Sequence, residues 1–494
     1  MAELLRITPQ DNVAVALTAL PFGQTVTVDG ITLTTVTDVP AGHKVALFPI
    51  KAGEKVIKYG FPIGYAKEDI PVGAHVHVHN LHTGLSGELT YEYHPTYPTI
   101  PEIPTATFMG YPRKDGRVGV RNELWILPTV GCVNDIARQL ERAAQELVGG
   151  GVECICAFPH PYGCSQMGDD QENTRTILAD LATHPNVGGV LVLGLGCENS
   201  SAAIIEEHMG NYDKSRVRFL VCQQVEDEFA EAMKLLRELA DNMRDEQRVP
   251  CPASKLVIGL KCGGSDGFSG ITANPVIGGF SDLLCGMGGT TILTEVPEMF
   301  GAETILMDRC NTRELFDKTV HLINDFKRYF EEHHQTIYEN PSPGNKAGGI
   351  STLEDKALGC TQKSGFSPVR DVLAYGERVH TPGLNLLSAP GNDLVAATAL
   401  ASACAQIVLF STGRGTPFAC PVPTLKIATN TPLATKKHGW IDFNAGQLLT
   451  DGKTLPELSQ ALMEDVLATA SGRLVCSERN GFHDLAIFKT GVTL

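Results

Sequence analysis

Three short apolar segments of this 494-residue chain each end in a glycine that is followed at once by a cysteine. They run into Gly131-Cys132, Gly163-Cys164 and Gly196-Cys197. Continuous apolar runs bounded by turn residues are typical of strands that are buried on both faces of a parallel sheet. If the runs are such strands, the three thiols lie in turns at the carboxyl ends of one sheet, where open α/β folds bind ligands. The pattern therefore predicts an α/β fold with a ligand site at one sheet edge.

Strand-like and helix-like patterns alternate over most of the chain beyond residue 110. An apolar run at 124–130 precedes a segment, 134–147, in which apolar residues recur at helical spacing. A long amphipathic pattern at 312–330 predicts another helix. Strands that alternate with helices indicate βαβ units and mainly parallel sheets. The other predicted strands are 152–158, 190–195, 217–221, 255–260, 290–295, 384–388, 405–410 and 425–428, and the other helices are 174–182 and 226–243.

The first part of the chain differs, because residues 1–94 contain no cysteine and show short β patterns separated by glycine and proline. The next segment, 95–107, is rich in proline, which favours an extended connector. Pro250-Cys251-Pro252 interrupts the later α/β pattern. We therefore predict a β domain (1–94), a linker (95–107), a middle α/β domain (108–250) and a C-terminal α/β domain (251–494). The strands predicted in the β domain are 25–28, 31–36, 44–49 and 75–79.

The charge of the chain limits its partners. A formal net charge of −16 argues against nucleic acid and membrane surfaces, which both need a basic face. The fourteen cysteines are spread thinly, unlike the dense framework of a small secreted module, so we expect reduced thiols. The N-terminus does not resemble a signal peptide, and no stretch approaches ~18 uninterrupted apolar residues. We expect a soluble cytoplasmic enzyme with a small-molecule substrate.

Three histidines alternate with valine near the end of the β domain. On a strand, His75, His77 and His79 project from one face. Imidazole is a common ligand of iron, manganese and zinc, and it can also protonate a leaving hydroxyl near neutral pH. The alternative is a polar strand face that points to solvent. If the small domain closes over the active site, these side chains can enter it.

The three Gly-Cys turns allow two interpretations. Cys132, Cys164 and Cys197 can hold an iron–sulfur cluster with one open iron, or a single soft metal ion. Alternatively, they are small buried residues that pack tight turns, as free cysteine usually does. Their spacing matches no short cluster motif, and both interpretations stay open.

A second glycine-rich segment, 262–275, follows the predicted strand 255–260. Glycines such as Gly264 let backbone N–H groups approach an anion, and the start of the following helix adds positive partial charge. With Ser265, Asp266 and Asn274, the segment is typical of a carboxylate or phosphate cradle. A purely structural turn is the alternative. Cys262 opens the segment with a thiol.

Charged residues follow other predicted strands. Glu295 and Glu298 supply hard oxygen ligands that suit magnesium, manganese or ferrous iron, unless they lie in a solvated loop. Lys346 and Arg414 lie in glycine-rich segments, where arginine can grip a carboxylate and a buried lysine can act as a base. Either can instead belong to a solvated surface loop. The dinucleotide fingerprint fails because Asn199 replaces its third glycine, and no Gly-Lys-Ser/Thr phosphate loop occurs.

Taken together, these segments resemble the altronate/galactarate dehydratase family from end to end. The triple histidine is similar to that of altronate-type members rather than the galactarate branch. The segments that carry the resemblance are 57–60, 75–80, 119–132, 162–166, 194–199, 262–275, 294–301, 340–349, 411–417 and 491–494.

The resemblance implies a hydro-lyase, activated by Fe²⁺ or Mn²⁺, that converts D-altronate to 2-dehydro-3-deoxy-D-gluconate in hexuronate breakdown. It also implies an N-terminal β-clip (SAF-like) domain, a middle dimerisation domain and a C-terminal Rossmann-like domain that carries the metal. We therefore expect a homodimer acting on a sugar acid. The alternatives are a galactarate or other sugar-acid dehydratase, a lyase that expels another group from carbon 3, and a non-catalytic sugar-acid-binding protein.

The chemistry suggests a role for each candidate residue. The proton on carbon 2 beside an ionised carboxylate is very weakly acidic, so a divalent cation must stabilise the charge that its removal creates. We assign the base to Lys346 and the acid to His77 or His79. The expected metal ligands are Cys262, Asp266, Glu295 and His75, and the expected substrate-binding residues are Arg414, Gly264, Ser265 and Asn274, with an iron–sulfur cluster on Cys132, Cys164 and Cys197 as the alternative cofactor.

Overall fold

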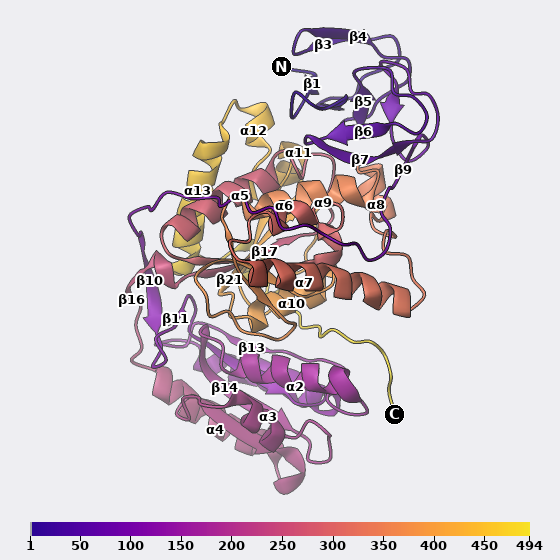
Figure 1. Cartoon of the computed structure of the whole chain (residues 1–494). Helices are drawn as coiled ribbons and strands as arrows, with labels where there is room; N and C mark the ends of the chain where they lie inside the picture. The colour runs from indigo at the N-terminus through magenta and orange to yellow at the C-terminus, as the bar shows by residue number, and fades with distance from the viewer. Residues whose placement is uncertain (1) are drawn as a thin grey trace.

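The computed structural model describes residues 2–494 and combines a small β domain with two α/β parts (Figure 1). The α/β class predicted from the sequence is confirmed. The β domain lies on the C-terminal part, and the middle part lies on the opposite side of it. None of the helices in residues 2–494 combines the length and the apolar character needed to cross a bilayer.

The N-terminal domain is built from short antiparallel strands. Its four-stranded sheet has the order β1-β2-β5-β8. Strand β8 (His75–Val76) is shorter than predicted, because the chain turns directly after it. His77 N donates to Asn80 Oδ1 (2.9 Å), and Asn80 N donates to His77 O (3.0 Å), so His77 and His79 lie in a turn and not in the strand. The other strands are β1 (Leu4–Leu5), β2 (Val13–Ala16), β3 (Thr25–Val28), β4 (Ile31–Thr34), β5 (Lys44–Ala46), β6 (Lys55–Lys58), β7 (Phe61–Ala66) and β9 (Leu81–His82).

Residues 83–106 contain no helix or strand and cross the surface of the C-terminal domain. Thr96 N donates to Asp308 O (2.8 Å), and Ile103 N donates to Gly286 O (2.9 Å). The chain then enters a three-stranded antiparallel sheet of order β11-β10-β16. Proline is tolerated in β16 because this strand lies at the sheet edge. The strands are β10 (Thr107–Pro112), β11 (Val118–Gly119) and β16 (Val249–Pro252).

The middle domain contains a four-stranded parallel sheet of order β13-β12-β14-β15. Strand β12 (Glu123–Pro128) shows why its sequence is continuously apolar. Leu124 and Ile126 belong to one buried cluster, and Trp125 and Leu127 belong to another on the opposite face. The other elements are β13 (Ile155–Ala157), β14 (Val187–Gly194), β15 (Val217–Val221), α1 (Asn134–Ala144), α2 (Gly168–Ala182), α3 (Ala202–Met209) and α4 (Glu228–Met243).

The C-terminal domain contains a seven-stranded parallel sheet of order β19-β20-β18-β17-β21-β22-β23. The strand order reverses beside β17 (Val257–Cys262), since β18 (Thr290–Leu293) lies on one side and β21 (Ile407–Thr412) on the other. Ligands of open α/β sheets bind outside the carboxyl ends of the strands at such a switch point. The other strands are β19 (Val369–Leu373), β20 (Gly383–Leu387), β22 (Thr424–Ala428) and β23 (Phe443–Asn444).

Helices cover both faces of this sheet and connect it to its neighbours. Helix α10 (Asp393–Ser402) contributes to the buried cluster that also contains α2 of the middle domain. The C-terminal tail returns to the middle domain, where Leu494 N donates to Ser165 O (2.9 Å). The remaining helices are α5 (Ala273–Gly286), α6 (Glu303–Met307), α7 (Arg313–Glu332), α8 (Pro343–Ala347), α9 (Leu353–Thr361), α11 (Thr431–Lys436), α12 (Gln447–Thr450), α13 (Leu455–Ala470) and α14 (Cys476–Arg479).

Candidate active site

The N-terminal domain meets the switch point of the C-terminal domain through glycines. A Cβ atom on Gly267 would lie 1.9 Å from Gly42 O, and one on Gly349 would lie 2.2 Å from the same oxygen. Both distances are far too short for a carbon atom, so a side chain at either position would push the two domains apart. Gly267 N also donates to Gly348 O (2.7 Å). The sequence 262–275 therefore acts partly as a docking surface.

A buried ion-pair network lies beside this contact. Asp355 of α9 accepts hydrogen bonds from Lys44 Nζ (2.8 Å) and Lys58 Nζ (2.9 Å) of the N-terminal domain. Burial lowers the pKa of Lys44 to about 8, although Asp355 opposes this shift. Burial also disfavours the charge of Asp355, but the two lysines more than offset it and hold its pKa below the ordinary value. The carboxylate thus ties two strands of one domain to a helix of the other.

Three histidines form a cluster at the same domain contact. One ring nitrogen each of His43, His75 and His77 lies within 4.8 Å of the others. His43 Nδ1 lies 2.9 Å from His75 Nε2, and His43 Nε2 lies 3.3 Å from Ala347 O. Nδ1 of His77 is buried and has no hydrogen-bond partner in residues 2–494. The cluster therefore faces the short helix α8, which carries Lys346.

The protonation of this cluster is shifted toward the neutral form. Burial and the neighbouring histidines lower the pKa of His75 to about 3. Burial and Lys44 lower the pKa of His77 to about 4. Neutral imidazole is the form that binds metal ions. The three side chains are thus suited to hold a divalent cation.

Two members of this cluster, His75 and His77, are predicted from the sequence, and the third, His43, is not. The predicted strand face of His75, His77 and His79 is confirmed only in that His75 and His77 lie together, with ring centroids 5.4 Å apart. His79 is exposed on the turn and is not part of the ligand-sized group. His43 replaces it, because β5 pairs with β8 and places Val45 opposite His75. The predicted strand at 44–49 was the available signal, but its pairing partner was not known.

A second group of potential ligands lies at the end of β17. The sulfur of Cys262 lies 3.2 Å from that of Cys360 in α9, and Cys360 Sγ lies 3.1 Å from Glu298 Oε2. All three side chains are buried. The pKa of Cys262 is lowered, and the largest of the several causes is its contact with the sulfur of Cys360. Nothing in the segment 353–361 distinguishes Cys360 from an ordinary helix residue, so sequence reasoning missed it.

The expected metal set of Cys262, Asp266, Glu295 and His75 is not brought together. Both oxygens of Glu295 are occupied, by Lys261 and by Lys363 Nζ at 3.0 Å. Asp266 accepts hydrogen bonds from side chains around it, among them Ser269 Oγ (3.0 Å), Thr429 Oγ1 (3.0 Å) and Asn430 Nδ2 (3.2 Å). Lysines and hydroxyls pair these buried carboxylates, as burial of a charge requires. The four metal ligands predicted from the sequence therefore do not form one site.

The predicted substrate cradle is only partly available to a ligand. Asn274 is fully engaged, because its Nδ2 donates to Gly359 O (2.9 Å) and its Oδ1 accepts from Ser411 Oγ (2.6 Å). Ser265 is buried, and its Oγ donates to Cys262 Sγ (3.4 Å). Both residues therefore position the loop, and both also line a small cavity beside Asp266 and Cys360.

Two cations remain at the rim of this cradle. Gly264 has a φ of +64°, and its carbonyl accepts from the backbone of Arg414 (3.1 Å). The Arg414 side chain is exposed and that of Lys346 is half-buried. The buried carboxylates nearby are paired by other lysines, namely Lys44, Lys58, Lys261, Lys356 and Lys363. Lys346 and Arg414 are thus placed to meet an anionic substrate.

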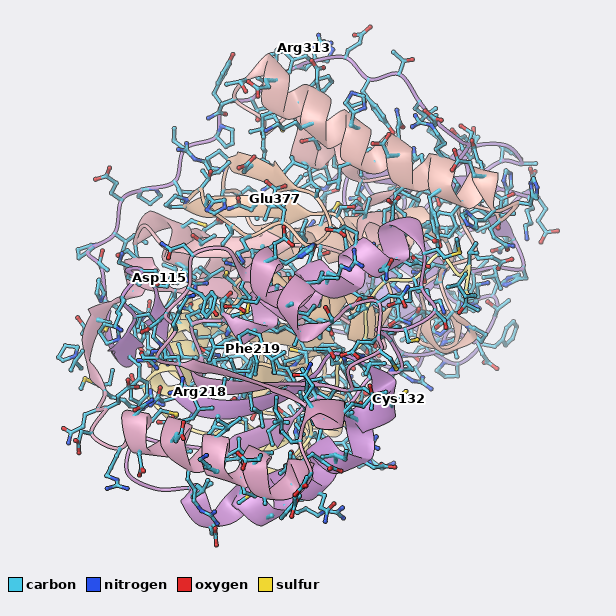
Figure 2. The ribbon with its side chains drawn as sticks, turned by 90° about the horizontal axis from the view of Figure 1, so that it is seen from below. Asp115, Cys132, Arg218, Phe219, Arg313 and Glu377 are labelled. Atoms are coloured by element: carbon cyan, nitrogen blue, oxygen red, sulfur yellow. The ribbon has the colours of Figure 1, made fainter. Side chains whose placement is uncertain are left out.

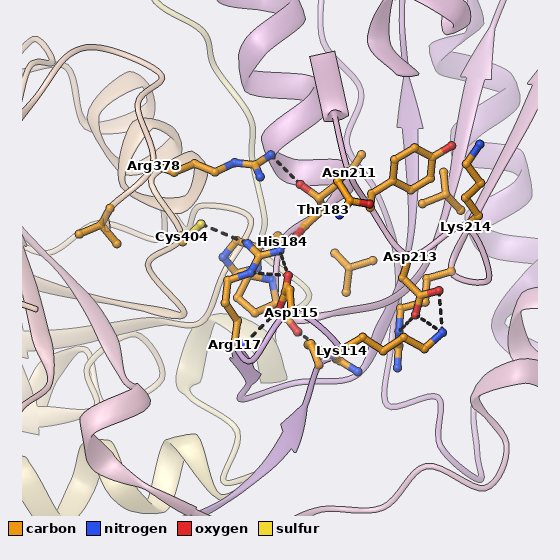
Figure 3. A pocket seen from close by; sticks show the side chains of 18 of the residues that line it. Lys114, Asp115, Arg117, Thr183, His184, Asn211, Asp213, Lys214, Arg378 and Cys404 are labelled. Atoms are coloured by element: carbon orange, nitrogen blue, oxygen red, sulfur yellow. Dashed lines mark hydrogen bonds and ion pairs between the residues drawn. The ribbon is translucent and has the colours of Figure 1, made fainter. Parts of the chain in front are cut away.

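A second cavity lies elsewhere, between the middle and C-terminal domains. It has a volume of about 660 Å³ and a strongly basic lining (Figure 3). Its cations are already paired, for example Lys114 with Asp213 (2.9 Å) and Arg117 with Asp115 (2.6 Å). None of the histidines or thiols of the domain contact lines it. We therefore place the candidate active site at the histidine cluster and the cradle.

The three Gly-Cys thiols lie far along the chain from this site. Cys132, Cys164 and Cys197 follow the carboxyl ends of β12, β13 and β14, as predicted from the apolar runs. All three are exposed, so they are not small buried residues that pack a turn. Within residues 2–494 they do not form a group tight enough for one metal ion.

Comparisons with known proteins agree over the whole chain. Residues 2–84 match the altronate/galactarate dehydratase SAF domain, residues 110–244 the D-galactarate dehydratase/altronate hydrolase second domain, and residues 253–493 the D-galactarate/altronate dehydratase C-terminal domain. The chain is 56% identical to an altronate dehydratase of Escherichia coli and 54% identical to one of Bacillus subtilis, with 100% of each protein covered. It is 33% identical to a galactarate dehydratase (L-threo-forming) of Escherichia coli, over 99% of this chain and 97% of that protein. The chain therefore belongs to the altronate/galactarate dehydratase family.

Proposed function

We propose that the chain is a hydro-lyase that dehydrates D-altronate to 2-dehydro-3-deoxy-D-gluconate and water. The observation that carries this function is the identity of 56% and 54%, over full length, to two altronate dehydratases. The galactarate alternative is not favoured, because the galactarate dehydratase matches at only 33%. The acidic net charge of −16 favours a small-molecule substrate over nucleic acid or a membrane. The family resemblance favours a cytoplasmic homodimer.

We infer that His43, His75 and His77 hold the divalent iron or manganese ion that the family implies. Two observations support this metal site. The three imidazoles are neutral and each has a ring nitrogen within 4.8 Å of the others, and the buried Nδ1 of His77 has no hydrogen-bond partner in residues 2–494. When bound, such an ion supplies positive charge that eases removal of the proton on carbon 2 of the sugar acid.

The group of Cys262, Glu298 and Cys360 suits a cation less well. Lys356 Nζ already pairs with Glu298 at 2.7 Å, and the positive charge of Lys363 also acts on Cys262. A metal ion there would have to displace or repel these lysines. We therefore favour the histidines as the metal site.

Residues of both domains bind the substrate and move its protons, namely Arg414 and Lys346 of the C-terminal domain and His79 of the N-terminal domain. Arg414 binds the carboxylate of the sugar acid through two parallel hydrogen bonds. Lys346 takes the proton from carbon 2 at Nζ. His79 gives a proton to the hydroxyl that leaves carbon 3. We give this role to His79 instead of His77, because His77 lies within the ligand group and His79 is exposed beside it, 5.4 Å from the His75 ring.

The site must open to admit a sugar acid. Between Lys58, Asp266, Asp355 and Cys360 the structure leaves a cavity of only about 10 Å³. This is smaller than the volume of any sugar acid, so we infer that the N-terminal domain moves away from the cradle when substrate enters this part of the site. Closure then brings the histidines against the substrate and excludes water.

The substrate assignment is tested by assaying the full chain, supplied anaerobically with ferrous iron, on a panel of sugar acids. We expect the chain to form 2-keto acid from D-altronate with a kcat/KM at least about tenfold larger than that for galactarate. The two acids differ at the end far from the reacting carbons, where galactarate carries a second negative charge and altronate carries none. Equal or faster turnover of galactarate contradicts the proposal. A thermal shift with altronate but no product would indicate a binding protein.

The metal site is tested with His43→Ala, using His82→Ala as the matched control. His82 lies on the same domain and is exposed, outside the histidine cluster. We expect His43→Ala to lose bound iron or manganese by elemental analysis and to lose activity, because two imidazoles hold an ion far less tightly than three. His82→Ala should keep both. Unchanged metal content in His43→Ala would show that the ion binds at another site.

A further inference from the structure

Three of the fourteen cysteines are exposed, and they are the three that follow glycine at strand ends. Cys132, Cys164 and Cys197 are exposed, whereas the other eleven are buried or half-buried. Free cysteine is among the residues most often buried, and an exposed thiol is prone to oxidation. The coincidence of exposure, preceding glycine and strand-end position in the same three residues requires an explanation.

The three thiols belong to adjacent turns at one edge of the middle-domain sheet. They follow β13, β12 and β14, which are neighbours in that order. Gly131 N donates to Tyr162 O (3.0 Å), and Ser200 N donates to Gly163 O (3.2 Å). Thr129 Oγ1 donates to Glu198 Oε1 (2.7 Å). Hydrogen bonds thus join all three thiol-bearing turns into one surface, where Figure 2 labels Cys132.

The glycine before each cysteine lies in a closely packed turn, most tightly at Gly163. A Cβ atom on Gly163, which has a φ of +100°, would lie 1.9 Å from Thr129 O. One on Gly196, with a φ of +129°, would lie 2.8 Å from Gln223 Oε1, and one on Gly131 would lie 3.0 Å from His160 O. The turns therefore press against their neighbours while each following thiol points outward. The arrangement holds three thiols in fixed positions at one edge.

The chemistry of this surface is that of a soft-metal cluster. The three sulfurs are not close enough together for a single ion. In an iron–sulfur cluster each thiolate binds a different iron, so the ligand sulfurs stand farther apart than around one ion. The C-terminal tail lies beside this surface, because Thr493 pairs with Gln166 directly after the Cys164 turn, and it leaves the three thiols exposed.

We propose that Cys132, Cys164 and Cys197 bind a four-iron iron–sulfur cluster and leave one of its irons without a thiolate. This centre is separate from the histidine site and does not rest on the proposed function. Its ligands come from the middle domain, whereas the histidines come from the N-terminal domain. The open iron makes it a site for an oxygen ligand or a small anion.

The proposal is tested on the full chain, purified anaerobically and reconstituted with ferrous iron and sulfide. We expect iron and acid-labile sulfide in similar amounts, with a broad visible absorption band. Cys132→Ser, Cys164→Ser and Cys197→Ser should each lose the sulfide and the band, whereas the half-buried Cys285→Ser should keep them. His43→Ala should also keep them, which separates this centre from the histidine site.

A second measurement does not depend on variants. Alkylation of the chain without metal should label Cys132, Cys164 and Cys197 before the other cysteines, and reconstitution should protect these three. Uptake of iron or zinc without sulfide overturns the proposal. So does a sulfide content that is unchanged in the three serine variants, or equal labelling with and without reconstitution.

Discussion

Replacing Lys346 by methionine is expected to lower kcat for altronate by about 10²- to 10⁴-fold, the usual contribution of a positioned general base. Lys346 follows Asn345 in helix α8, and Asn345 Nδ2 donates to Ser265 O (2.9 Å) and thereby fixes the helix against the cradle. The helix also faces His43 through Ala347 O (3.3 Å). Methionine keeps the length of the side chain but cannot accept a proton. The measurement is the exchange of the carbon-2 hydrogen of altronate with deuterated water, which should stop.

Two controls separate the loss of a base from the loss of a charge. Lys346→Arg keeps a cation for substrate binding but cannot take up a proton, so kcat should fall while KM changes little. Lys453→Met, at an exposed position outside the site, should behave as the unaltered chain. Exchange at the ordinary rate in Lys346→Met would exclude Lys346 as the base.

The local patterns of the sequence predicted the central strands of the sheets well. A strand that is buried on both faces needs apolar residues at consecutive positions, and such a run can be recognised in a single sequence. Every residue of β14 and of β21 is buried, and the strands predicted at 190–195 and 405–410 overlap them. Helix α7 was predicted as 312–330 and extends over Arg313–Glu332. In these elements the local period and the tertiary environment agree, so a single sequence is sufficient.

The ligand groups were predicted less well, because they depend on contacts between distant segments. Helix α9 is buried over all nine residues, including Asp355 and Lys356, and its role follows only from its partners. Asp355 pairs with lysines about 300 residues earlier, at separations of 311 and 297 positions. Glu295 is predicted from the sequence as a metal ligand, but Lys261 and Lys363 pair with its two oxygens. No local pattern encodes such pairings.

Replacing Asp355 by asparagine is expected to lower the free energy of unfolding by about 3–5 kcal/mol, the cost of leaving buried charges without their partner. Lys44 and Asp355 have fully buried side chains, and that of Lys58 is 3% exposed. Asparagine has a similar shape but no charge, so two buried ammonium groups would lose their counter-ion at once. Because the lysines and Asp355 belong to different domains, we expect the N-terminal domain to separate from the C-terminal domain before the rest of the chain unfolds. Chemical denaturation and limited proteolysis within residues 83–106 measure both effects.

The matched variant for this prediction is Asp451→Asn, which removes an exposed carboxylate and should change the unfolding free energy little. A compensating variant sharpens the argument. Removing the two charges as well, in Asp355→Asn with Lys44→Met and Lys58→Met, should recover much of the lost stability, because a buried apolar group needs no counter-ion. Such recovery without recovery of activity would show that the network holds the histidine cluster against the cradle. A loss below about 1 kcal/mol in Asp355→Asn alone would mean that the lysines are hydrated or neutral and that another contact docks the N-terminal domain.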